Sequence, residues 1–141
     1  MNVVLFACTH NAGRSQMAAA FFTALADPER ARAISAGTAP GPRVHPVVAE
    51  AMREVGIDLT VVAPRLLTPE LAATASLLIT MGCGETCPLV PGLPIEDWAL
   101  PDPKDLPLAE VRAIRGTIRD RVAALVTAHA WARNSPTEAT P

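Results

Sequence analysis

The chain has 141 residues, half of them hydrophobic, and its 12 basic and 14 acidic side chains leave a formal net charge of −2. This length fits one domain with its own core, and the nearly balanced charge argues against nucleic acid or an anionic membrane surface as a main partner. No apolar run approaches the ~20 residues that a membrane span needs, and no basic segment precedes the first apolar run, so we expect neither a membrane span nor a signal peptide.

A predicted strand, turn and helix open the chain. The apolar run Val3–Ala7 predicts a buried strand, and Gln16–Ala26, which is rich in strong helix formers, predicts a helix. Ala33–Thr38 predicts a short second strand. Because a helix joins the two strands, we expect them to be parallel with a right-handed crossover.

The rest of the chain predicts three more helices, two more strands and a polar tail. In chain order these are a helix with Pro46 in its first turn and Gly56 at its end, a short helix capped by Thr68 with Pro69 in its first position, strands over Ser76–Met81 and Ile95–Leu100, and a long amphipathic helix from Leu106 or Pro107 to about Ala130. The predicted fold is therefore α/β, a three-layer, four-stranded, mostly parallel sheet with helices on both faces. We assign residues 1–131 to this single domain and expect residues 132–141, which lack an apolar pattern, to be a disordered tail.

The turn between the first strand and its helix carries the sequence CTHNAGRS, from Cys8 to Ser15. Unpaired N–H groups and the helix dipole favour an oxyanion here, and Arg14 can bind two of its oxygens with its planar fork. The same field favours thiolate over thiol at Cys8, and Ser15 can either donate to that thiolate or cap the helix. Gly13 permits a backbone conformation that a side chain would forbid. A buried, inert cysteine is the weaker interpretation, because the CX5R spacing falls at a strand-to-helix junction.

Other reactive side chains follow the third and fourth predicted strands. Cys83 and Cys87 follow the third strand, and Asp102 follows the fourth. Ligands of such sheets bind beyond the carboxyl ends of the strands, so we expect these groups to lie near Cys8. Asp102 is a candidate general acid, whereas Asp97 and Asp105 compete for that role but each has a structural explanation.

The odd count of three cysteines favours reduced thiols in a cytoplasm over a disulfide framework. A metal at Cys83 and Cys87 would need two further ligands, and since the chain has only three histidines we expect a redox pair rather than a metal site. His45, one of those histidines, precedes Pro46 at a predicted helix start. We interpret it as a local cap or surface residue rather than a catalytic group, with a place beside the anion turn as the alternative.

These motifs resemble the low-molecular-weight tyrosine phosphatase superfamily and, more closely, the arsenate reductases built on that fold. The resemblance is carried by Cys8–Ala18 (CTHNAGRSQMA), Ser35–Thr38, Met52–Asp58, Ile79–Gly84 and Glu96–Pro103. It implies an enzyme that reduces arsenate to arsenite, and it selects Asp102 as the acid because the family carries its acid in an Asp-Pro pair. The residues that it implies for oxyanion binding are Thr9, His10, Asn11, Ala12, Gly13, Arg14 and Ser15.

The resemblance also implies a sequence of thiol reactions. Cys8 attacks arsenic while Asp102 assists the loss of water, and Cys83 then attacks the sulfur of Cys8 so that arsenite leaves. Cys87 next attacks Cys83, and thioredoxin reduces the resulting Cys83–Cys87 disulfide. One helical turn can bring Cys83 and Cys87 within the ~4.4–6.8 Å between Cα atoms that a disulfide needs. We expect no bound cofactor, only this external dithiol reductant, and phosphate or sulfate can occupy the same loop.

Departures from the family pattern leave alternatives open. The spacing of Cys83 and Cys87 is shorter than in the best-known thioredoxin-coupled members, and members that use a small-molecule thiol such as mycothiol form a mixed disulfide at the nucleophile. A phosphomonoester hydrolase needs only the nucleophile, the arginine and the acid, but Gly13 and Lys104 replace a cysteine and a tyrosine that such phosphatases usually carry. A non-catalytic module that binds oxyanions or arsenite is the third interpretation.

Overall fold

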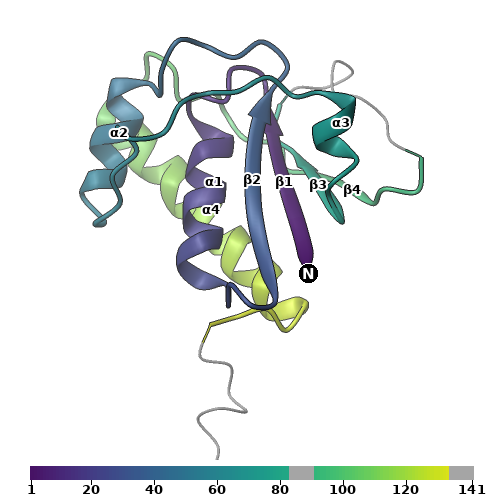
Figure 1. The fold of residues 1–141 in the computed structure, drawn as a ribbon. Coiled ribbons are helices and arrows are strands. Elements are labelled where there is room, and N and C mark those ends of the chain that lie inside the picture. Colours follow the sequence, from purple (N-terminus) through teal and green to yellow (C-terminus); the bar gives the residue numbers. More distant parts are fainter. Residues whose placement is uncertain (83–90, 134–141) are drawn as a thin grey trace, which may run out of the picture.

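A computed structural model describes residues 1–82 and 91–133 (Figure 1). Its elements are β1 (Asn2–Cys8), α1 (Arg14–Leu25), β2 (Ala31–Gly37), α2 (Pro46–Arg53), α3 (Pro69–Ala72), β3 (Leu77–Thr80), β4 (Ile95–Asp97) and α4 (Leu108–Ala128). The order and type of these elements confirm the predicted α/β fold. The predicted roles of Cys83 and Cys87 and most of the predicted tail lie outside the described residues.

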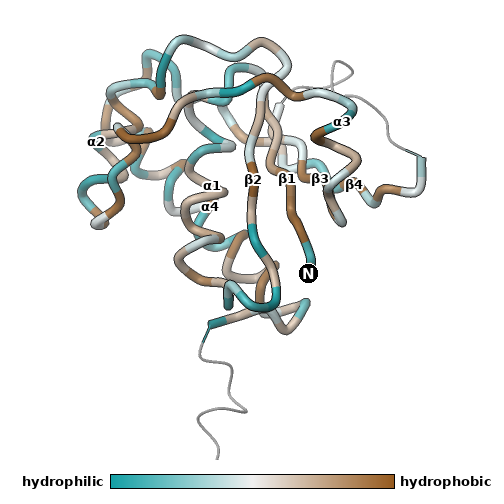
Figure 2. Tube along the Cα trace, in the orientation of Figure 1, coloured by the Kyte–Doolittle hydropathy of each residue, from teal (hydrophilic) through white to brown (hydrophobic). Residues whose placement is uncertain are grey.

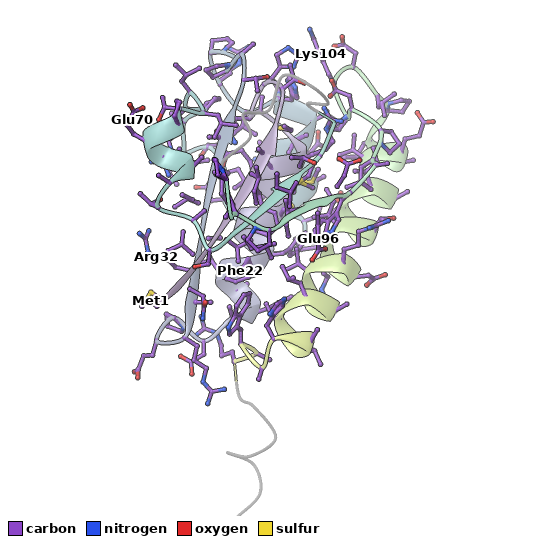
Figure 3. All side chains as sticks on the ribbon, turned by 90° about the vertical axis from the view of Figure 1, so that its right-hand side faces the viewer. Met1, Phe22, Arg32, Glu70, Glu96 and Lys104 are labelled. Atoms are coloured by element: carbon purple, nitrogen blue, oxygen red, sulfur yellow. The ribbon has the colours of Figure 1, made fainter. Side chains whose placement is uncertain are left out.

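The four strands form one parallel sheet in the order β2-β1-β3-β4. Val4 in β1 pairs with Ala33 in β2 on one side and with Leu77 in β3 on the other. Since all the strands run in the same direction, their carboxyl ends share one edge of the sheet. Figure 3 shows Lys104 at that end of the molecule and Met1 at the opposite end.

Helices cover both faces of the sheet and create two apolar layers. On one face α1 packs against α4, and α4 also contacts α2. The core between these helices and the sheet includes the buried side chains of Phe6, Phe22 and Trp98. The short α3 covers the opposite face, where Leu5 and Leu78 are fully buried. Figure 2 shows hydrophobic residues along β1 and hydrophilic residues in the turn between α1 and β2.

Several element ends differ from the prediction for local reasons. β4 is limited to Ile95–Asp97. The next residue, Trp98, donates its N–H to the carbonyl of Thr80 at 2.8 Å, and its side chain is buried in the core. α2 ends at Arg53, and the chain then turns to reach Gly56 at φ +84°. α3 begins as predicted, with the hydroxyl of Thr68 accepting from the N–H of Leu71 at 3.0 Å.

The long α4 has the predicted amphipathic character. Its buried side chains recur at helical spacing and are Val111, Ile114, Ile118, Val122, Leu125 and Val126. After α4 the indole of Trp131 packs edge-on against Phe22, with the ring centroids 6.0 Å apart. Among residues 1–82 and 91–133, the structure contains no helix with the length and apolar character to span a membrane.

Candidate active site

The turn that follows β1 directs its carbonyl groups outward. Each carbonyl from residue 8 to residue 13 accepts a hydrogen bond from a group outside the inner face of the turn. The bonds run from Thr38 N to Cys8 O (3.2 Å), Ala39 N to Thr9 O (2.8 Å), Gly41 N to His10 O (3.0 Å), Gln16 Nε2 to Asn11 O (3.1 Å), His45 N to Ala12 O (2.9 Å) and Met17 N to Gly13 O (3.0 Å). In the described part of the chain, the N–H groups of residues 10–15 have no acceptor. This arrangement leaves a set of inward N–H groups at the start of α1, which suits an oxyanion.

Asn11 holds the turn in shape. Its backbone lies in the left-handed region at φ +51°, which asparagine tolerates better than most residues. Its side-chain oxygen accepts from Arg65 N at 3.0 Å and from Gln16 Nε2 at 3.1 Å, and its Nδ2 donates to Ser15 Oγ at 2.7 Å. Both polar atoms of this buried amide are therefore hydrogen-bonded. Neither Gln16 nor Arg65 was predicted to support the turn.

The hydrogen bond between Asn11 and Ser15 also determines whether the Ser15 hydroxyl can donate or accept. An amide nitrogen can only donate, so Ser15 Oγ is the acceptor in that bond and keeps its own hydrogen available. Cys8 Sγ lies 2.9 Å from Ser15 Oγ and is buried. The hydroxyl can therefore donate a hydrogen bond to the sulfur. The alternative role is not observed, because Gly13 is the N-cap of α1 and the cap has no side-chain hydrogen bond.

Arg14 lies beside the turn with its guanidinium almost enclosed. The side chain is 7% exposed, its Nη1 donates to the carbonyl of Leu100 at 3.1 Å, and its Nη2 is 3.8 Å from Asp102 Oδ2. Its Nε is buried and has no hydrogen-bond partner among the described residues. A buried unpaired donor is costly, and an oxyanion bound to the inward N–H groups would give it an acceptor.

Asp102 is placed at the rim of this site. Its side chain is 42% exposed, and its Oδ1 accepts from the N–H of Lys104 at 3.0 Å. The adjacent Pro103 packs on the turn so closely that a Cβ on Gly13 would lie 2.7 Å from Pro103 Cγ. Gly13 has φ −146° and ψ −91°, and the approach of Pro103 leaves no room for a side chain at this position.

The competing carboxylates are held elsewhere. Asp97 Oδ1 accepts a hydrogen bond from the hydroxyl of Thr80 at 2.7 Å, which ties it to the neighbouring strand. Asp105 lies in the loop before α4 with φ +62°. Of the three predicted candidates, Asp102 is the one that forms an ion pair with Arg14 in the described structure.

His45 lies closer to the site than we expected. It is the N-cap of α2 without a side-chain cap bond, its N–H donates to the turn at Ala12, and its ring lies edge-on to that of His10 with centroids 6.4 Å apart. Burial lowers the pKa of His45 below its ordinary value of 6.5, so the imidazole is neutral at pH 7. These two histidines line a pocket of about 320 Å³ with Arg43 and Lys104, next to the turn.

The carboxyl end of β3 also reaches the turn, as the parallel sheet requires. The hydroxyl of Thr9 donates to the carbonyl of Gly82 at 3.4 Å. Gly82 is the last described residue before Cys83, and both Cys83 and Cys87 lie outside the described residues. Within the described ranges, no cluster of three or more His, Cys, Asp or Glu side chains is arranged to hold a metal ion.

Several known proteins are similar to this chain in sequence and in structure. The family model for low molecular weight phosphotyrosine protein phosphatase matches residues 3–135. A putative arsenate reductase from Halobacterium salinarum is 37% identical over 125 residues, which cover 83% of this chain and 85% of that protein. A glutaredoxin arsenate reductase from a Synechocystis strain is 33% identical over 129 residues, covering 89% and 97%.

A solved structure shows the same similarity in three dimensions. The thioredoxin-dependent arsenate reductase of Corynebacterium glutamicum superposes with a TM-score of 0.77 at 34% sequence identity. The match covers 91% of this chain but 61% of that one, so this chain spans less than two thirds of its length.

Proposed function

Because the chain belongs to the low molecular weight phosphotyrosine protein phosphatase family, we propose that its β1–α1 turn binds arsenate and that the protein reduces it to arsenite. The observation that carries the proposal is the buried Nε of Arg14, which has no partner among the described residues, together with the N–H groups of the turn and a hydrogen-bonded Cys8. The names of the similar proteins support arsenate over other tetrahedral anions.

In the first step Cys8 acts as the nucleophile. Its sulfur attacks arsenic, one arsenate oxygen leaves as water with a proton from Asp102, and a covalent bond joins Cys8 Sγ to arsenic. Arg14 and the N–H groups of the turn stabilise the negative charge on the remaining oxygens. The exposure of Asp102 lets it take another proton from water after each turnover.

The second step transfers the electrons. A second thiolate attacks Cys8 Sγ, the sulfur–arsenic bond breaks with its electron pair on arsenic, and arsenite leaves as arsenic(V) becomes arsenic(III). We propose Cys83 as this thiol and Cys87 as the next one, which attacks Cys83, frees Cys8 and leaves a Cys83–Cys87 disulfide. The support is the position of Cys83 and Cys87 in the sequence soon after β3, with Cys83 next to Gly82, whose carbonyl accepts from the hydroxyl of Thr9.

We propose thioredoxin as the external reductant of that disulfide, with the cytoplasm as the compartment where such thiols stay reduced. The thioredoxin-dependent similar protein supports this choice. The glutaredoxin arsenate reductase among the relatives supports a different thiol system. A mixed disulfide between Cys8 and a small thiol such as mycothiol is the corresponding alternative.

Arsenite release with thioredoxin, thioredoxin reductase and NADPH tests the redox proposal. We expect turnover in the unchanged protein and its loss in Cys8→Ser, Cys83→Ser and Cys87→Ser. Mass mapping of the cysteines after one turnover then identifies the route. A Cys83–Cys87 disulfide supports the proposal, whereas full turnover of Cys83→Ser or a thiol adduct on Cys8 contradicts it.

A phosphomonoester hydrolase is the second candidate, because Cys8, Arg14 and Asp102 suffice for that reaction. In support, Cys8 bonds to Ser15 in the β1–α1 turn and Arg14 Nη2 lies 3.8 Å from Asp102 Oδ2. It predicts that Cys83→Ser and Cys87→Ser keep full activity on an aryl phosphate. Some phosphatase activity is compatible with the reductase, so the ratio of kcat/KM for the two substrates decides. Tight anion binding with no turnover of either substrate would instead indicate a binding module.

A further inference from the structure

Gly82, two residues after the end of β3, contacts Arg14 and has no side chain. Gly82 adopts φ +96°, and a Cβ built on it would lie 3.1 Å from Arg14 Cζ and 3.4 Å from Nη2, with Nη1 closer still. Contacts of this kind to a nearly buried guanidinium cannot be relieved without moving the guanidinium. The methyl group of an alanine at Gly82 would therefore overlap the Arg14 guanidinium.

We propose that Gly82 is a positioning residue for oxyanion binding, because its bare backbone holds the Arg14 guanidinium with its Nε edge toward the β1–α1 turn. Nη1 donates to Leu100 O at 3.1 Å, and Nη2 lies 3.8 Å from Asp102 Oδ2, beyond hydrogen-bond distance. Among the described residues the edge formed by Nε and Nη2 therefore has no hydrogen-bond acceptor and can bind two oxygens of an anion. The hydroxyl of Thr9 donates to the carbonyl of Gly82 and ties this contact to the turn itself. The inference rests on the proposed anion binding but not on the redox steps.

Two other glycines provide matched comparisons. Gly56 and Gly92 have φ of +84° and +81°, close to that of Gly82, yet a Cβ on either would meet no atom of the described residues within 4 Å. Alanine at each of the three positions pays a similar backbone cost, whereas at Gly82 alone it also meets the guanidinium. Any excess effect of Gly82→Ala is therefore due to the contact and not to the strained backbone.

The test uses inorganic phosphate as the probe and protection of Cys8 from iodoacetamide, followed at Cys8 by mass spectrometry, as the measurement. We expect Gly56→Ala and Gly92→Ala to change the protecting phosphate concentration by less than about twofold, and Gly82→Ala to raise it at least about tenfold. Thermal unfolding measured in parallel separates loss of binding from loss of folding. Phosphate binding by Gly82→Ala that matches the two control variants would overturn the proposal.

If Gly82→Ala is markedly less stable, the effect of Gly82→Ala is also measured in a protein that carries Arg14→Lys. In Arg14→Lys the flexible ammonium replaces the planar group that Gly82 contacts, so the added Gly82→Ala change should alter phosphate protection by less than about twofold. An undiminished tenfold effect in that background would show that Gly82 does not act through Arg14. If phosphate does not protect Cys8 in the unchanged protein, the oxyanion site itself is wrong and the proposed function fails first.

Discussion

Two arginine–carboxylate pairs in this molecule differ in how completely they are satisfied. Glu54 on the α2 side accepts from Arg112 Nη2 at 2.6 Å and from Arg115 Nη1 at 2.8 Å, and these hydrogen bonds lower the pKa of Glu54 to about 2. Arg14 and Asp102 are 3.8 Å apart, and Arg14 keeps a buried Nε without a partner in the described structure. The closed cluster joins two helices, whereas the open pair leaves donors for a ligand.

This difference shows that a buried donor without an acceptor indicates the anion site better than the volume of a pocket does. The pocket of about 460 Å³ that runs along α2 is larger than the one beside the turn, but neither Cys8, Arg14 nor Asp102 is among the residues that line it. A buried guanidinium N–H without an acceptor destabilises the folded protein, and a bound anion would remove that penalty. The comparison therefore predicts large functional effects at the open pair and small stability effects at the closed one.

Arg14→Lys should produce the largest effect. A lysine keeps the charge but cannot present two parallel donors or hold the bond to Leu100 O, so we expect arsenate reduction to lose about 10³-fold in kcat/KM. Steady-state kinetics with arsenate measure this loss. The same exchange in the closed cluster, Arg115→Lys, should leave kcat/KM within about twofold, and equal losses in both variants would remove the distinction between the pairs.

Asp102→Asn should have the next largest effect. The amide preserves shape but cannot give up a proton to the leaving oxygen, so we expect kcat to fall about 10²-fold while phosphate binding changes by only a few fold. Single-turnover measurements with arsenate separate the two quantities. Asp97→Asn is the matched control, because that carboxylate bonds to Thr80 instead. A larger loss of kcat in Asp97→Asn would reassign the acid.

Ser15→Ala tests the nucleophile rather than the pair. Removing the hydroxyl that lies 2.9 Å from Cys8 Sγ also leaves Asn11 Nδ2 without its acceptor, so the thiolate loses a donor and the turn loses a support. We expect alkylation of Cys8 at neutral pH to slow by about tenfold. Thr23→Ala, which removes an exposed hydroxyl from the same helix, should not change the alkylation rate. Equal rates in both variants would rule out this role of Ser15.

Glu54→Gln should give the smallest effect, confined to stability. The carboxylate is exposed, so we expect Tm at pH 7 to fall by only about 1–2 °C and arsenate reduction to stay unchanged. Since the folded pKa is depressed from 4.5 to about 2, the contribution is complete above pH 4.5 and is lost as the pH falls toward 2. Urea midpoints of both proteins across this range should converge in acid, and a constant difference would contradict the assignment.

The sequence predicts local features of this molecule better than contacts between distant segments. Apolar runs and cap residues such as Thr68 identify the strands and helices, and the CX5R spacing identifies the turn with Ser15 beside Cys8. The support of the turn was missed, because Arg65 and Leu100 contribute backbone groups that any residue carries. Backbone donors and acceptors leave no mark in a sequence until the fold brings them together.

The role of His45 was also underestimated for a physical reason. A histidine before a proline at a helix start has a local explanation, and only the hydrogen bond from its backbone to Ala12 places it against the turn. Gly82 shows the same limit, because a glycine in a loop usually indicates a turn. Its contact with Arg14 depends on the register of β1 and β3.

The outward pairing of the carbonyls from residue 8 to residue 13 has one more consequence. The N–H groups that face the anion belong to the main chain, which every amino acid except proline supplies. The geometry of the turn therefore survives exchange of the side chain at a half-exposed position such as His10. Substitutions at such positions can therefore change the entrance to the site, and with it the selectivity for different anions, while the N–H groups that bind the oxygens stay in place.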